Sequence, residues 1–147
     1  MEGLTLVPII HLHADKPPLE AIAPAIEVIE AGGVVAYPTE TFYGLGVDAL
    51  NGEAIKKIYT LKKRSFSQPL LMLISHREVL PTYVREVPEV ARRLIHKFWL
   101  GPLTLIFFAA PHLPPLLCAH TGKVAVRISS HPIAQVLVEA VNFPITS

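Results

Sequence analysis

Apolar residues recur at intervals of three and four in two segments of the chain, which is the spacing of one face of an α-helix. Residues 19–31 carry isoleucine and alanine on one face and are followed by two glycines, and residues 54–62 end in lysine. Two further segments, 88–99 and 131–141, have proline near their first turn, as helices often do. We predict helices over these four ranges, with the Ser130 side chain as the N-cap of the last.

Short apolar runs lie between the predicted helices and end at residues that break regular structure, as strands do. These runs cover residues 6–12, 34–37, 69–75 and 103–110. Residues 34–37 form a run short enough to be buried on both faces. Residues 124–129 alternate instead, with branched apolar residues on one face and the cations Lys123 and Arg127 on the other. Strands and helices mixed in this order predict an α/β fold with a mixed sheet.

Length and composition limit the class of protein. The chain has 147 residues, of which 51% are hydrophobic and 17% charged, so one domain with a substantial core is expected. The net charge of +1 excludes the strong cationic field of a nucleic-acid coat protein. The most apolar stretch, residues 103–118, is interrupted by prolines, and no secretory signal is readable at the start. We therefore expect a cytoplasmic protein that makes no membrane contact.

Several common sites are absent from the sequence. Cys118 is the only cysteine, which excludes an internal disulfide and a cysteine-rich zinc motif. The seven histidines are scattered, and His11 and His13, which would share a strand face, have no third partner. The sequence contains neither of the two common phosphate-binding loops, GxxxxGK[ST] and GxGxxG after a strand, and no GxSxG nucleophile elbow. We predict no metal site made of protein ligands and no catalytic nucleophile.

Two loop segments could bind a ligand. PTETFYGLG, residues 38–46, places two hydroxyls, a carboxylate and a phenol directly after a predicted strand, and ligands of open α/β sheets bind beyond strand ends. The alternative is a turn whose hydroxyls satisfy its own backbone. Lys62 and Arg64 end a helix and could hold a polyphosphate. Their alternative is a solvated helix end with cations matched to its dipole.

A third candidate is Arg127, on the polar face of its strand. Its guanidinium could bind a carboxylate through two parallel hydrogen bonds. The alternative is a surface ion pair that contributes little to stability.

Four motifs in the same order resemble the YrdC-like domain of threonylcarbamoyl-adenylate synthases. They are PTETFYGLG, the K-x-R loop at Lys62 and Arg64, FWLGPLTLIF at residues 98–107, and VAVRIS with HPIA in residues 124–134. The resemblance runs from about residue 19 to the end. It implies a single-domain, open, twisted mixed β-sheet with flanking helices around a concave basic cavity.

The family resemblance also implies an activity. Such enzymes condense L-threonine, bicarbonate and ATP, with Mg²⁺ expected on the phosphates, to threonylcarbamoyl-AMP and pyrophosphate for a tRNA modification. By position, Thr39, Arg127 and Ser147 would bind L-threonine. Lys62, Arg64 and Lys123 would bind ATP. Contact with tRNA or double-stranded RNA, and with proteins of the later modification steps, would follow.

The sequence departs from the family pattern at two kinds of place. Ser129 and Ser130 replace a usual proline-led pair, and Ser65 replaces a proline after the K-x-R loop. The family continues beyond Ser147 into a Ser-Ala-Asn motif that helps to hold ATP, so we expect residues 1–147 to be a single domain truncated at its C-terminal end. An extended chain should then form the adenylate much faster.

Two other functions fit parts of the sequence. An RNA-binding module could use a basic cavity of the same fold without catalysis, although the net charge of +1 disfavours it. A relative that serves another small molecule is disfavoured because Thr39, Lys62, Arg64 and Arg127 occur together.

Overall fold

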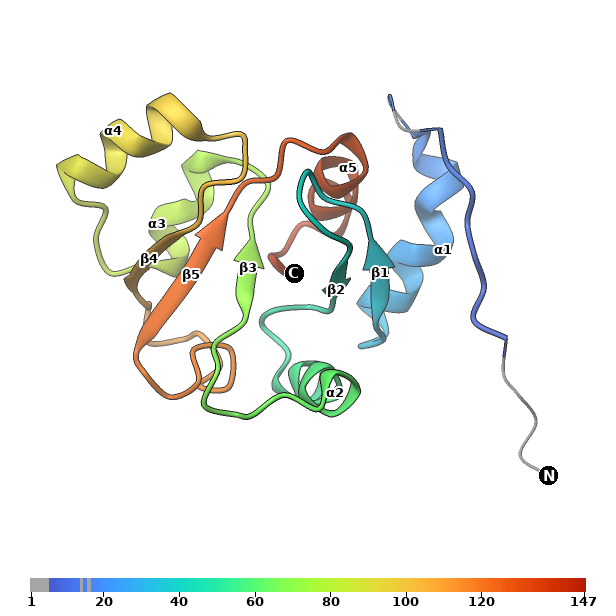
Figure 1. The fold of residues 1–147 in the computed structure, drawn as a ribbon, viewed down its shortest axis with the longest axis horizontal. Helices are drawn as coiled ribbons and strands as arrows, with labels where there is room; N and C mark the ends of the chain where they lie inside the picture. Colours follow the sequence, from blue (N-terminus) through green and yellow to red (C-terminus); the bar gives the residue numbers. More distant parts are fainter. Residues whose placement is uncertain (1–5, 14, 16) are drawn as a thin grey trace.

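The computed structural model describes residues 6–13, 15 and 17–147 as a mixed sheet with helices around it (Figure 1). The strands are β1 Val35–Tyr37, β2 Gly44–Gly46, β3 Leu71–Leu73, β4 Leu105–Phe108, β5 Lys123–Arg127 and β6 Ile145–Thr146. The helices are α1 Leu19–Glu30, α2 Gly52–Lys62, α3 Leu80–Tyr83, α4 Glu89–Phe98 and α5 Pro132–Val141, with a 3-10 turn at Arg77–Val79. Among the described residues no helix is long and apolar enough to cross a bilayer.

Four strands form one sheet in the order β4-β5-β3-β6. β3 and β5 are parallel, whereas the other two pairings are antiparallel. β1 and β2 form a separate antiparallel pair. The Thr146 amide donates to the Val47 carbonyl at 3.0 Å, so β6 connects this hairpin to the larger sheet. This connection fixes the position of the hairpin and its loops relative to the loops of the larger sheet.

Two hydrophobic cores fix the faces of the sheet. One packs α2 and α4 against the buried face of β5, where Val124 and Val126 are fully buried. The other packs α1 and α5 against β1, β3 and β6 around Tyr37 and Leu73. Figure 1 shows α4 and α1 at opposite ends of the molecule.

Part of one sheet face is open to solvent. Because side chains alternate along a strand, Lys123 and Arg127 lie on the opposite face of β5 from the two buried valines. Ile106 and Phe108 of β4 share this face and are 69% and 55% exposed. The open part of this face is thus lined by exposed apolar side chains and Lys123, whereas Arg127 is only 14% exposed.

The predicted pattern is largely confirmed. Helices form at each of the four predicted ranges, although α2 begins at Gly52, two residues before the predicted range 54–62. Strands form within residues 34–37, 69–75 and 103–110, and β5 begins at Lys123, one residue before the predicted range 124–129. The mixed α/β architecture is also as predicted. The elements not anticipated are β2, the 3-10 turn and α3, whose three or four residues are too few to show a period.

Three local predictions were wrong. Residues 6–12 form no strand, although they are extended in Figure 1, because they pair with no other strand; His11 and His13 therefore share no strand face. Residues 34–37 are not buried on both faces, since Ala36 is exposed. The α5 cap is His131 rather than Ser130, and its Nδ1 accepts from the Ile133 amide at 3.2 Å.

Gly46 allows the hairpin to pack against the Tyr37 ring. A Cβ at Gly46 would lie 2.7 Å from Cε1 of this buried ring. We expect Gly46→Ala to lower the free energy of unfolding by about 1–3 kcal/mol, the usual cost of overpacking. Urea denaturation measures the change.

Gly52→Ala is the matched control for this substitution. A Cβ at Gly52 meets nothing within 4 Å, and the residue begins α2. The control should be neutral or slightly stabilising. Equal stability of the two variants would contradict the packing argument.

Candidate functional site

The loop after β1 meets the end of β5 although the two are far apart in the sequence. In the loop, the Thr39 hydroxyl donates to the Phe42 carbonyl at 2.6 Å and accepts from the Thr41 amide at 3.2 Å. These bonds are those expected of a turn that satisfies its own backbone. The same turn also brings Glu40 and Thr41 to Arg127.

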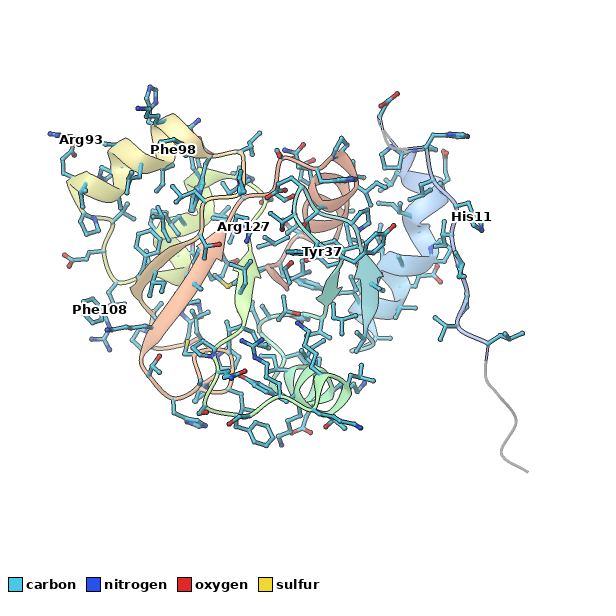
Figure 2. All side chains as sticks on the ribbon, viewed as in Figure 1. His11, Tyr37, Arg93, Phe98, Phe108 and Arg127 are labelled. Carbon is cyan, nitrogen blue, oxygen red and sulfur yellow. The ribbon has the colours of Figure 1, made fainter. Side chains whose placement is uncertain are left out.

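Three hydrogen bonds hold the Arg127 guanidinium. Nε donates to Thr104 Oγ1 at 3.1 Å, and Nη1 donates to Thr41 Oγ1 at 3.2 Å and to Glu40 Oε1 at 3.3 Å. Figure 2 shows Arg127 at the centre of the molecule. Its side chain is 14% exposed, so this is a largely buried ion pair rather than the surface pair of the alternative interpretation.

Glu40 is bound at both carboxylate oxygens. Oε1 faces Arg127, and Oε2 accepts from the Ser129 hydroxyl and, at 3.1 Å, from the Ser130 amide. Burial would raise the pKa of Glu40, but the hydrogen bonds that it accepts from Ser129, from its own backbone amide and from Arg127, together with the Arg127 charge, outweigh burial and hold the pKa below its ordinary value. Glu40 is therefore ionised at neutral pH.

Ser147 follows β6 and lies against Gly44, where this loop leads into β2. Its amide donates to the Leu71 carbonyl at 3.0 Å, and a Cβ at Gly44 would lie 2.5 Å from its hydroxyl. The neighbouring Tyr37 hydroxyl donates to the Thr146 carbonyl at 2.6 Å. Burial raises the pKa of Tyr37 well above its ordinary value, so this phenol stays protonated and serves as a donor.

The three predicted ATP residues lie around the other end of the β3–β5 pair. Lys62 ends α2 with an exposed side chain, and its pKa is lowered first by partial desolvation and then by the Arg64 charge. Arg64 Nη2 donates to the Pro69 carbonyl at 2.7 Å. Lys123 begins β5, and its amine lies 5.8 Å from the Phe108 ring centroid.

Two of the predicted threonine-binding residues are connected through hydrogen bonds, whereas the predicted ATP-binding residues are not connected to one another within the described part of the chain. Thr39 and Arg127 share one hydrogen-bonded network through Thr41. Lys62 makes no hydrogen bond or ion pair within the described residues, whereas Arg64 is used to hold its own loop. The described residues contain no group of three acidic, histidine or cysteine side chains that could hold a metal.

Sequence reasoning missed the roles of Glu40, Thr104 and Ser129. Glu40 was visible as the carboxylate of the PTETFYGLG segment, but its partner Arg127 is 87 positions away. No local spacing rule connects such residues. Only the polar character of all three at strand ends was a usable signal.

The ionised state of Glu40 predicts a pH dependence of stability. Because the folded pKa lies below the unfolded value of about 4.5, the stabilisation is present above that value and is lost as pH falls through the folded pKa. We expect the stability advantage of the parent over Glu40→Gln to be constant near pH 6–7 and to shrink below about pH 4.5. Urea denaturation of both proteins across this range measures it, and an advantage that grows on acidification would refute the assignment.

Comparison with known proteins places the chain in a family. The family model for Sua5, YciO and YrdC proteins, described as telomere recombination, matches residues 27–147. A threonylcarbamoyl-AMP synthase of Pyrococcus abyssi is 40% identical over 119 residues, which are 81% of this chain and 35% of that protein. The synthase of Bacillus subtilis is 40% identical over 127 residues, or 86% of this chain and 37% of that protein.

Solved structures agree with this result. P. abyssi Sua5 complexed with L-threonine superposes with a TM-score of 0.90 and 37% identity, covering 95% of this chain and 41% of that one. E. coli YciO superposes with a TM-score of 0.83 and 29% identity, covering 92% of this chain and 66% of that one. The chain thus spans little more than a third of its curated relatives, and it belongs to the Sua5/YciO/YrdC family.

Proposed function

We propose that this chain binds L-threonine and ATP as the synthase domain of an L-threonylcarbamoyl-adenylate synthase. The observation that carries the proposal is the Arg127 guanidinium, held by three hydrogen bonds beside the Thr39 loop. Two relatives that share 40% of their aligned residues with it are named as such synthases. A related Sua5 has been solved with L-threonine.

The proposed threonine site uses both ends of the amino acid. The Arg127 guanidinium pairs with the substrate carboxylate, and Thr39 contacts the substrate side chain. Ser147 completes the site next to Gly44. The substrate amine then remains available to form a new N–C bond with the carbon of bicarbonate, giving a carbamate and releasing water.

The proposed reaction needs positioning and charge neutralisation rather than a protein nucleophile. A carbamate oxygen attacks the α-phosphorus of ATP, the bond from that phosphorus to the pyrophosphate oxygen breaks, and pyrophosphate leaves. Lys62, Arg64 and Lys123 would neutralise the phosphate charge at their end of the β3–β5 pair. Magnesium would take its ligands mainly from phosphate oxygens.

The product would serve tRNA modification through proteins of later steps. Direct contact with tRNA or double-stranded RNA belongs to the same proposal. If the protein binds RNA but does not bind threonine, this result would instead favour an RNA-binding module.

Arg127→Ala tests the threonine site. Loss of a charged hydrogen-bonding partner should weaken L-threonine binding by about 1.5–3 kcal/mol, or roughly ten- to 150-fold. Isothermal titration calorimetry on the parent and the variant measures the loss. Equal affinities of the parent for serine and threonine would contradict a pocket that recognises the methyl group.

Arg93→Ala is the matched control for Arg127→Ala. Arg93 lies on α4, is 79% exposed and pairs only with Glu89 among the described residues, at 3.5 Å. Figure 2 shows it far from Arg127. If the two variants weakened threonine binding equally, Arg127 would not be the carboxylate ligand.

Lys62→Ala tests the ATP site. We expect the variant to lose the pyrophosphate release that depends on ATP, threonine and bicarbonate. The assay uses the full-length protein. The melting temperature should change little, because a cation at a solvated helix end contributes well under about 1 kcal/mol.

Lys56→Ala, on the same helix, is the control for Lys62→Ala. Its amine pairs with Glu53 at 2.9 Å and its side chain is 54% exposed. The control should keep full activity. Unfolding of Lys62→Ala would show a structural role instead.

A further inference from the structure

The Arg127 guanidinium has N–H donors that its hydrogen bonds to other side chains do not use. A guanidinium has five N–H donors. Nε gives its one hydrogen to Thr104, and Nη1 gives its two to Glu40 and Thr41. Among the described residues Nη2 donates no hydrogen bond, so its two hydrogens remain for a ligand.

Glu40 makes the only charged contact in this set. The two side chains are both 14% exposed, so the pair is shielded from water. A carboxylate beside a guanidinium also competes with a ligand carboxylate for the same charge. A glutamate at this position therefore favours binding of a substrate carboxylate only if it orients the guanidinium.

Ser129 prevents Glu40 from turning away. Its hydroxyl donates to Glu40 Oε2 and accepts from the His131 amide at 3.1 Å, and the residue is 3% exposed. The Ser130 amide adds a second bond to the same oxygen.

We propose that Glu40 is a positioning residue, clamped by Ser129, that presents Arg127 Nη2 to the carboxylate of the amino-acid substrate. The inference rests on the proposed function, because it assumes that the substrate is L-threonine. Its physical basis is preorganisation: a guanidinium that is already immobilised loses less side-chain entropy when it binds.

Ser129→Ala tests the clamp without changing any charge. Ordering a long side chain on binding costs about 0.5–1.5 kcal/mol, so the dissociation constant for L-threonine should rise about two- to twelve-fold. In turnover, KM for threonine should rise while kcat stays nearly constant. Thr60→Ala, which removes an exposed hydroxyl bonded to the Lys56 carbonyl on α2, should change neither quantity.

A double-mutant cycle separates positioning from a general loss of structure. If Ser129 acts through Arg127, Ser129→Ala should have no further effect on threonine affinity in an Arg127→Ala background. Equal weakening in both backgrounds would overturn the proposal. Glu40→Gln, which removes the competing charge, should also weaken binding, and tighter binding by this variant would show that Glu40 is only a competitor.

A measurement on the unliganded protein gives a second readout. The Nε–H signal of Arg127 in NMR should report a rigid side chain in the parent and a more mobile one in Ser129→Ala. Unchanged mobility would overturn the clamp even if the variant is too unstable for calorimetry. Absence of threonine binding by the parent overturns the proposed function, whereas parent binding that Arg127→Ala weakens and Ser129→Ala leaves unchanged overturns this inference alone.

Discussion

The two-residue repeat of β5 is the constraint on which the rest of the structure depends. Val124 and Val126 are fully buried in one core, so the pleat obliges Lys123 and Arg127 to face the other side. A shift of register by one residue would bury both cations and expose both valines. The burial of two apolar side chains therefore also fixes where the site's charges lie.

The sheet order determines which segments can reach these charges. Parallel pairing of β3 with β5 puts Leu73 beside Arg127, and β6 on the far side of β3 connects to the β1–β2 hairpin. The loop after β1 is thereby held at the same end of the sheet as Arg127. At the opposite end, the Arg64 loop lies against the start of β3 through its bond to Pro69.

The elements were predictable where a period or a breaker marks them, and the site was predictable only in part. The alternation of residues 124–129 is enough to predict both the buried and the cationic face of β5, and the burial of its residues agrees. The run at residues 6–12 has the same apolar character, but strand formation needs a partner that the sequence of one segment does not reveal. Likewise residue type predicts Ser130 as the cap, because serine is preferred there and histidine is not. The structure uses His131, whose side chain turns back to the Ile133 amide.

The Tyr37 ring occupies space that a side chain at Gly46 would need, while its hydroxyl is bonded to Thr146. Tyr37, Gly46 and Thr146 therefore constrain one another through packing and hydrogen bonding, although they come from β1, β2 and β6. During divergence, a larger residue at position 46 becomes acceptable only together with a smaller one at position 37, which would leave the Thr146 carbonyl in need of a new donor. In this part of the fold, sequence change should therefore proceed by correlated steps at distant positions rather than by independent drift.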